Sequence, residues 1–379
     1  MAGSDPKDFF KQQPEAPAIK AEVLPPFFKS WVEARQAEET ISVDKPLLYL
    51  DLQAVPSSTP EVAATASHKL LKNLFISAGS RYDANKAVQP VFLDGSKAGL
   101  QQLQEQVEAL PFYEDLHHKP VFLHSPETIG WVKEQLSQGT PAFVATDPFG
   151  HKLAQDLWHL ALEQGQSDFL LLFEYKRLAS AFKTAKEGSA LATLLGDRLP
   201  KIREFFLRAG HASKKEKFAL EQFKESLLDR EFQTSTFKIN APGKDQTQFY
   251  LLLVSKNELA HTRFKEQLLP YCEYQEDGVA LFGANQKAIK VLVPEYYQYL
   301  PFSQMKLTQD LAQKAALFHS MTLEKIYQKH NVGTPYSREN YLTAFEKLKE
   351  EGKITLLNPK TGQVVYKLAF TCRIKFKKE

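Results

Sequence analysis

The sequence predicts an α/β fold, in which a doubly wound, mostly parallel sheet is followed by a smaller module of helices and a hairpin. The first observation is that short, continuous apolar runs alternate with helical patterns over the first part of the chain. Strands and crossover helices of a parallel sheet alternate in this way. The second is that residues 301–379 show helical periodicity followed by a hairpin signal.

Residues 1–40 are predicted to form a helical lead-in. Apolar residues recur at helical spacing between Ile19 and Ala37. Pro25 and Pro26 fall within this pattern, and proline lacks the amide hydrogen that a helix interior needs. The helix is therefore expected to begin or kink at these prolines.

The apolar runs of the sheet are typical of strands that are buried on both faces. They lie at residues 47–52, 88–93, 120–123, 141–146 and 169–173. Helical patterns follow at residues 61–78, 97–110, 126–138 and 151–164.

Residues 176–230 are predicted to be a helical insertion with many lysines and arginines on its exposed faces. Two β-like runs follow, at 232–239 and 247–254, and Pro242-Gly243 between them predicts a hairpin. Parallel strands closed by an antiparallel hairpin are the layout of class I methyltransferases. We therefore expect a methyltransferase-like α/β domain over residues 41–300.

The last part of the chain, residues 301–379, is predicted to be a winged-helix domain. Helical patterns cover 307–318, 322–330 and 337–351, and the hairpin comprises 353–357 and 364–368. Ser337 is a suitable N-cap for the last helix and Gly352 a suitable stop. Three helices followed by a hairpin wing describe this relative of the helix-turn-helix motif.

Composition excludes several classes of protein. The 48 basic and 45 acidic residues give a net charge of only +3, so the whole-chain charge does not indicate a nucleic-acid binder. Two cysteines cannot form a disulfide framework or a zinc site, and the spacing of His151 and His159 does not suit one metal ion, so no metal is predicted. No apolar stretch approaches the ~20 residues of a membrane span. We therefore expect a cytoplasmic protein that does not contact a membrane.

Several separate stretches resemble the three-Cys-motif partner proteins, a family of methyltransferase-like proteins from bacteria and phages. The stretches that carry the resemblance are Ile19–Leu24 before Phe27 and Phe28, Leu48–Leu52, Ser58–Ala63, Thr146–Gly150 and Gly333–Tyr336. The resemblance spans most of the chain, but only the Asp-Pro-Phe-Gly turn within 146–150 is sharp, so the chain resembles a divergent member. It implies S-adenosylmethionine as cofactor, with Asp51 and Asp94 at its binding site.

The turn of Asp147, Pro148 and Phe149 allows two interpretations. It resembles the catalytic turn of amino-group methyltransferases, in which a carboxylate and a backbone carbonyl accept hydrogen bonds from an exocyclic amine. The aromatic ring then stacks on a base that has left its helix. In the alternative, the turn is structural: Asp147 caps the following helix, Pro148 takes its first position and Phe149 packs inward.

The loop after the first strand departs from the methyltransferase pattern. It contains no glycine from Gln53 to Ser58, whereas glycine lets the backbone approach the cofactor closely. Val55 resists a positive φ, and Pro56 lacks a backbone donor. The departure favours a scaffold with a degenerate S-adenosylmethionine site that binds nucleic acid or protein. The alternative is an active amino-group methyltransferase acting on nucleic acid, so it stays open whether the chain is an enzyme.

The winged-helix domain offers local basic residues for a partner. Arg338 and Lys347 lie on its last helix, and Lys353 and Lys360 belong to the wing. These residues suit the phosphates of a nucleic acid. The same helix also contains several glutamates, which is compatible with a protein partner.

Overall fold

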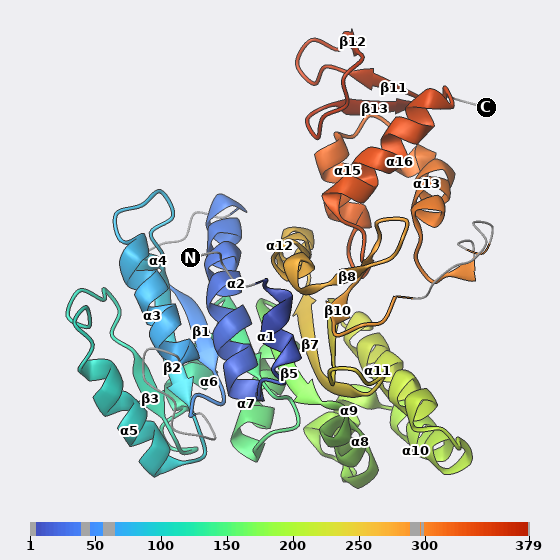
Figure 1. Cartoon of the computed structure of the whole chain (residues 1–379). Coiled ribbons are helices and arrows are strands. Elements are labelled where there is room, and N and C mark those ends of the chain that lie inside the picture. The colour runs from blue at the N-terminus through green and yellow to red at the C-terminus, as the bar shows by residue number, and fades with distance from the viewer. Residues whose placement is uncertain (1–4, 39–45, 56–64, 289–295, 297–298, 378–379) are drawn as a thin grey trace. The chain divides into compact units, whose positions relative to one another are not determined.

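The computed structural model describes residues 5–38, 46–55, 65–288, 296 and 299–377 (Figure 1). The chain divides into two units. The α/β unit comprises residues 12–239 and 246–256, and the C-terminal unit comprises residues 1–11, 240–245 and 257–379.

The sheet of the α/β unit has the strand order β6-β7-β5-β4-β1-β2-β3. Its strands are β1 (Leu47–Asp51), β2 (Val88–Leu93), β3 (Val121–Leu123), β4 (Ala142–Thr146), β5 (Ser167–Glu174), β6 (Gln233–Asn240) and β7 (Thr247–Ser255). Strands β3, β2, β1, β4 and β5, which lie next to one another in this order, are parallel. Strand β7 runs antiparallel to β5. This is the order of class I methyltransferases, so the predicted fold is confirmed.

Helix α2 (Ala16–Glu38) precedes β1, and helices connect the following strands near the predicted positions. They are α3 (Ala66–Ser77), α4 (Ala84–Ala87), α5 (Lys97–Glu108), α6 (Gly130–Ser137) and α7 (Lys152–Gln164), with α4 as an addition that was not predicted. Helices α2 and α3 lie side by side on the sheet (Figure 1). Residues 56–64, which include Pro56, the segment Ser58–Ala63 and the start of the predicted helix 61–78, lie outside the described residues.

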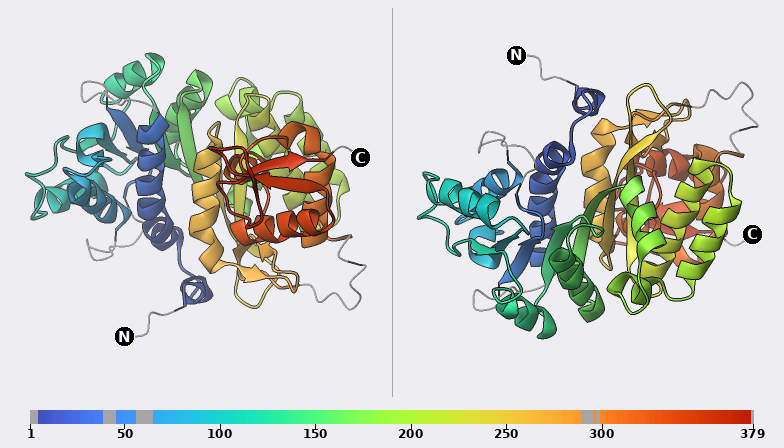
Figure 2. Two further views of the ribbon diagram at one scale, coloured as in Figure 1. Left: turned by 90° about the horizontal axis from the view of Figure 1, so that it is seen from above. Right: turned by 90° about the horizontal axis from the view of Figure 1, so that it is seen from below.

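The predicted helical insertion is present between β5 and β6. It contains α8 (Tyr175–Thr184), α9 (Ala190–Leu195), α10 (Arg198–Arg208) and α11 (Ala212–Leu228). These helices pack on one another in the green and yellow-green part of the ribbon (Figure 2). Their apolar faces belong to the same hydrophobic cluster as α7 and β5.

The expectation that α2 begins or kinks at its prolines is wrong, because one helix runs from Ala16 to Glu38 with Pro25 and Pro26 inside it. Proline at position 25 removes the hydrogen bond that the Ala21 carbonyl would accept. Lys69 replaces it: its Nζ lies 3.2 Å from the Ala21 oxygen. The Asn73 side chain also donates to the Pro25 carbonyl at 3.1 Å. Helix α3 therefore supplies the donors that α2 needs to continue.

The C-terminal unit contains the predicted winged-helix elements and further ones. They are α1 (Lys7–Lys11), α12 (Glu258–Leu268), η2 (Leu269–Tyr271), β8 (Glu273–Tyr274), β9 (Ala280–Leu281), β10 (Gly283–Ala284), α13 (Gln304–Gln313), α14 (Ala315–Phe318), α15 (Leu323–His330), α16 (Arg338–Glu350), β11 (Ile354–Leu357), β12 (Val364–Val365) and β13 (Arg373–Phe376). Its small antiparallel sheet has the order β12-β11-β13. A winged-helix domain is thus confirmed, while β13 is an addition that the sequence pattern did not predict.

Two local features of this unit follow directly from the sequence. Ser337 caps α16 as predicted, in a capping box with Asn340, and Gly352 ends the helix with φ near +70°. The predicted helix 307–318 is wrong as one element, because Lys314 (φ −90°, ψ 17°) separates α13 from α14. Helix ends are thus predicted well where a capping side chain or a glycine marks them.

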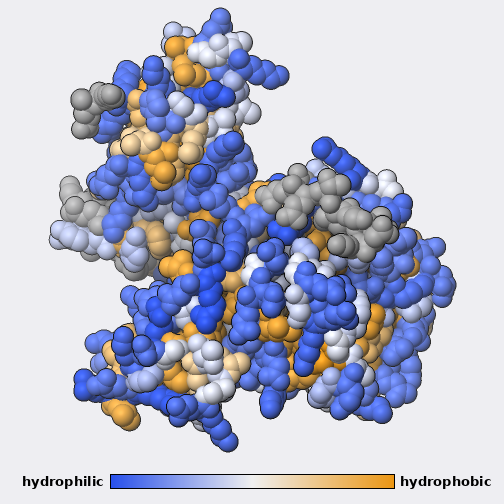
Figure 3. All heavy atoms as spheres, turned by 180° about the vertical axis from the view of Figure 1, so that it is seen from behind, coloured by the Kyte–Doolittle hydropathy of each residue, from blue (hydrophilic) through white to orange (hydrophobic). Residues whose placement is uncertain are grey.

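On the face shown in Figure 3, hydrophobic residues reach the surface in small areas separated by hydrophilic ones. Among the described residues, no helix combines the length and the apolar character that crossing a bilayer requires.

Candidate functional site

The candidate site lies in the α/β unit at the carboxyl ends of the central strands. From β1, strands β2 and β3 follow in one direction across the sheet, whereas β4 and β5 follow in the other direction. Strands β1 and β4 therefore flank the switch point of the sheet. Ligands of open α/β sheets bind in the crevice outside this point. Here a cavity of about 1040 Å³ is lined by loops after β1, β2, β4 and β5 and by α2.

Asp51 ends β1 beneath this cavity, and its carboxylate is fully buried. The Lys20 ammonium, from α2, lies 2.5 Å from Asp51 Oδ1 and 2.7 Å from the Gln53 carbonyl. The backbone N–H of Gln53 donates to the same Asp51 oxygen at 3.1 Å. Asp51 does not line the cavity, whereas Lys20 does. The carboxylate thus fixes α2 and the loop after β1.

Two side chains connect the loop after β1 with the turn after β4. The Gln53 Oε1 accepts a hydrogen bond from the Asp147 N–H at 3.0 Å. The ring of His151 accepts from the Ala154 N–H through Nδ1, at 3.2 Å, and lies 3.1 Å from the Leu52 carbonyl through Nε2. These contacts require the tautomer with its proton on Nε2. His151 is therefore the N-cap of α7, and the alternative in which Asp147 caps this helix is wrong.

Asp94 follows β2 and lines the cavity, as expected for a residue at the cofactor site. Its Oδ2 accepts from the Val55 N–H at 3.1 Å and its Oδ1 from the Ser96 N–H at 2.9 Å. The Val55 side chain lies against α5, where a Cβ on Gly99 would be only 2.6 Å from Val55 Cγ1. The hydrogen bond from Val55 thus holds the loop after β1 against the Asp94 carboxylate, the group expected to contact the ribose of the cofactor.

Hydrogen bonds tie the loops after β1, β2 and β4 together across the cavity. Each oxygen of Asp94 accepts one backbone N–H, and the Gln53 amide crosses the space between the loops after β1 and β4. The crossing is so close that a Cβ on Gly150 would lie 2.0 Å from Gln53 Nε2.

Asp147 is buried, and its carboxylate is held by groups of the protein. Arg177, from α8, forms an ion pair with its Oδ2, and the Phe149 N–H donates to its Oδ1 at 2.9 Å. Burial raises the pKa of Asp147, although the Phe149 N–H and Arg177 oppose this shift. The Arg177 side chain is more than half exposed, whereas that of Asp147 is buried.

The ring of Phe149 packs toward the helical insertion. Its centroid lies 5.3 Å from that of Phe173, 6.1 Å from Phe182 and 5.6 Å from Phe223. Pro148 beside it is buried. The turn after β4 is thus anchored in the hydrophobic core, although Phe149 also reaches the cavity wall.

His159 lies on α7 beyond the turn. Among the described residues, no cluster of histidine, cysteine, aspartate or glutamate could hold a metal ion. His159 is 8% exposed, and its ring lies 4.3 Å from that of Trp158. Burial and the Arg230 charge lower its pKa to about 4.

The lowered pKa of His159 predicts acid sensitivity of the α/β unit. The unfolded chain binds a proton near pH 6.5 and the folded chain only near pH 4, so stability is lost as the pH falls through this window. The loss by pH 4 is about 3 kcal/mol. Urea unfolding between pH 7 and pH 4 should show a shallower decline for His159→Gln than for the wild type. The same change at the exposed His117 should leave the decline intact; equal slopes for all three proteins would contradict the assignment.

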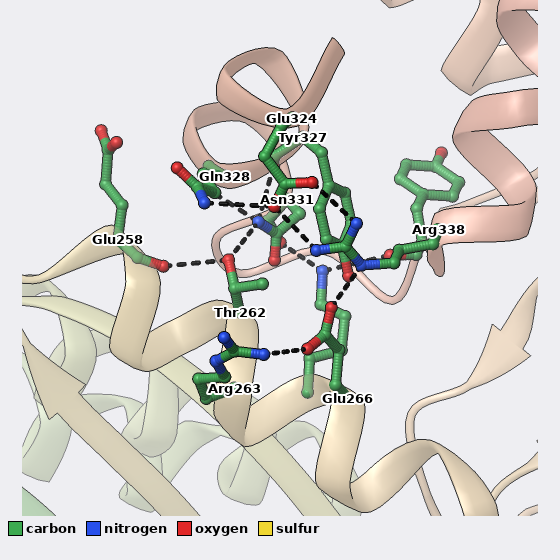
Figure 4. A network of polar contacts seen from close by, with 11 residues as sticks. Glu258, Thr262, Arg263, Glu266, Glu324, Tyr327, Gln328, Asn331 and Arg338 are labelled. Carbon is green, nitrogen blue, oxygen red and sulfur yellow. Dashed lines mark hydrogen bonds and ion pairs between the residues drawn. The ribbon is translucent and has the colours of Figure 1, made fainter. Parts of the chain in front are cut away.

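The predicted partner residues of the winged-helix domain differ in their surroundings. The Arg338 guanidinium donates to both Glu324 oxygens, at 2.7 and 2.8 Å, and to Glu266 at 2.6 Å (Figure 4). It also lies 4.4 Å from the centroid of the Phe370 ring. Arg338 therefore joins α12, α15 and α16 within the C-terminal unit and has little capacity left for a phosphate.

The remaining predicted partner residues lie at the surface. Lys347 is exposed on α16, and Lys360 is exposed in the loop between β11 and β12. Lys353 is also exposed, and it pairs with Glu351 at 2.8 Å.

Sequence reasoning missed several side chains that shape the site: Lys20, Gln53, His151 and Arg177. Lys20 stood inside the stretch that carries the family resemblance, and His151 directly follows the predicted turn. Nothing in the pattern around Gln53 or Arg177 pairs either residue with Asp147, which lies 94 and 30 positions away. Only the folded chain brings these groups together.

Parts of this chain are similar to known proteins. Residues 303–361 match the model of a family described as the GMT-like wHTH domain. Among solved structures, the methyltransferase domain of bacterial CtHen1 shares 10% identity and a TM-score of 0.30, covering 60% of this chain and 99% of that domain. A SAM-dependent methyltransferase from Methanosarcina mazei shares 11% identity and a TM-score of 0.26, covering 56% of this chain and 93% of its own. None of the curated proteins matches.

Proposed function

We propose that this chain is a methyltransferase-like scaffold of the three-Cys-motif partner type, with a degenerate S-adenosylmethionine site and a winged-helix domain that binds nucleic acid. The observation that carries the proposal is the closure of the loop after β1. The Val55 N–H donates a hydrogen bond to Asp94, and the Gln53 side chain accepts one from the Asp147 N–H. A loop held at both points leaves no room for the close backbone approach that the cofactor needs.

The turn after β4 supports the same reading. A base-holding turn needs a free carboxylate and a free aromatic face. Here Arg177 pairs with Asp147, and Phe149 packs against rings of the core. With these contacts, the turn of Asp147, Pro148 and Phe149 is better suited to hold the helical insertion in place than to orient an amine for methyl transfer.

Calorimetry with S-adenosylmethionine tests the degenerate site. We expect no binding heat from the wild type at about 1 mM ligand, so that any binding free energy is weaker than about −4 kcal/mol. A variant that reopens the loop, Gln53→Gly with Val55→Gly, is expected to bind more tightly than the wild type. Both proteins should keep the same circular dichroism spectrum.

The second candidate is an active amino-group methyltransferase on nucleic acid, with Asp51 and Asp94 at the cofactor. The cavity of about 1040 Å³, which has Asp94 and Asp147 in its walls, favours it. Micromolar binding of the cofactor by the wild type, abolished in Asp94→Ala, would establish this enzyme and overturn the degenerate site. Transfer of a labelled methyl group to duplex DNA would complete that outcome.

A further inference from the structure

The exposed charges of the C-terminal unit are distributed unevenly over its elements. Strand β13 alternates exposed and buried residues, with Ile374 and Phe376 in the core. Arg373, Lys375 and the following Lys377 therefore lie exposed on the other face. Because the N–H and carbonyl of Ile374 are hydrogen-bonded to residues 321 and 320 along the outer edge of β13, this row of cations projects from the exposed face of the small sheet.

The wing adds cations and apolar contact area to this row. Lys360 and Lys367 are exposed on either side of β12. The turn at Lys360 is fixed by the Asn358 side chain. It accepts hydrogen bonds from the Lys360 N–H at 2.9 Å and from the Thr361 N–H at 3.1 Å. Nearby Tyr366 is 84% exposed. We call Lys360, Lys367, Arg373, Lys375 and Lys377 together the basic ribbon.

The ribbon continues onto α15. Arg373 pairs with Thr322 in an isolated β-bridge just before this helix. A cavity of about 400 Å³ is lined by Arg373, Lys325 and Lys329, with Glu258 as the acidic residue in its wall. Among the residues that the structure describes, no side chain of the ribbon forms an ion pair.

Helix α16, the element that a winged helix would insert into the major groove, has no such excess of exposed cations. Its exposed or half-exposed charges include Glu339, Glu346 and Glu350 but only Lys347 and Lys349 as cations outside the Arg338 network. Lys349 is paired with Glu346 at 2.7 Å. Duplex DNA has one negative charge per about 1.7 Å of its axis, and α16, whose three glutamates balance Arg338, Lys347 and Lys349, has no excess of cations to offset it.

We propose that the C-terminal unit binds duplex nucleic acid by the phosphate backbone through the basic ribbon, and does not read bases with α16. This inference rests on the proposed function, since it specifies how its winged-helix domain takes nucleic acid. A row of cations along a strand and a fixed turn suits the regularly spaced phosphates of the nucleic-acid backbone. Base readout instead requires hydrogen-bond donors and acceptors that enter a groove. Binding is therefore independent of base sequence and falls steeply with salt.

Fluorescence anisotropy of the full chain with a labelled duplex DNA tests this inference. The variant Arg373→Gln, Lys375→Gln, Lys377→Gln should bind at least tenfold more weakly at moderate salt. The slope of log K against log salt should fall by about 2 to 3, since each lost phosphate contact lowers it by about 0.9. Lys360→Gln with Lys367→Gln should lower the slope by about 2 and serves as an independent variant.

The control is Lys347→Gln on α16, which should leave affinity and salt slope unchanged. A loss in Lys347→Gln as large as that in the β13 variant would overturn the backbone mode and leave the nucleic-acid function standing. So would a more than tenfold preference between duplexes of unrelated sequence. If the wild type does not bind duplex DNA at low salt, the nucleic-acid function itself fails, and the winged-helix domain is assigned to a protein partner.

Discussion

Lys20→Met is expected to lower the free energy of unfolding of the α/β unit by about 3–5 kcal/mol. The change removes the only ammonium that contacts the Asp51 carboxylate among the described residues and leaves that buried carboxylate with the Gln53 N–H and the more distant Tyr49 hydroxyl. A buried charge without its counter-charge costs more than the ion pair contributes. Urea unfolding measured by circular dichroism checks the value.

Two further variants separate the ion pair from the packing of α2. Lys29→Met, on an exposed position of the same helix, should change stability by less than about 0.5 kcal/mol. The double variant Lys20→Met, Asp51→Asn should recover much of the loss, because the buried group is then neutral and can still accept the Gln53 N–H. A double variant as unstable as the sum of the single changes would show that the ion pair is not the cause.

Phe143→Ala is expected to destabilise the α/β unit by about 3–5 kcal/mol. This ring from β4 is fully buried, with centroids of Trp31 at 5.1 Å, Phe28 at 5.4 Å and Phe27 at 5.8 Å, all from α2. Truncation leaves a cavity between strand and helix that such rigid rings cannot collapse to fill. The shift of the urea midpoint gives the measurement.

Leu207→Ala is the matched control for this truncation, because Leu207 is 88% exposed. It should change stability by less than about 0.5 kcal/mol. If Phe143→Ala lost no more than this control, α2 would not depend on the aromatic cluster for its place on the sheet. The helix that carries Lys20 would then be held by its polar contacts alone.

Much of the architecture could be predicted because it depends on local chemistry and on the period of apolar residues. Continuous apolar runs placed the parallel strands, and Pro242-Gly243 placed the hairpin between β6 and β7. Ser337 and Gly352 marked the ends of α16. The turn of Asp147 to Gly150 was also located correctly at the end of β4, since a strand that ends in such residues must deliver them to the edge of the sheet.

The partners of the polar groups could not be predicted in this way. Lys69 supplies a donor to the carbonyl that Pro25 leaves free, so α2 continues where a local rule ends it. Gln53 contacts Asp147, and Arg338 contacts Glu266 and Glu324, across long stretches of sequence. Strand β13 was not predicted, although Ile374 and Phe376 alternate with cations in the pattern typical of a half-buried strand.

The sequence by itself thus determined the class of fold, the order of its elements and the place of the turn after β4. Only the tertiary structure decided that the loop after β1 is hydrogen-bonded to Asp94 and Asp147 and that Arg338 is held inside its unit. The physical reason is that periodicity reports which side chains are buried. The pairing of polar groups instead depends on distances of about 3 Å between atoms, and residues far apart in sequence reach them only after folding.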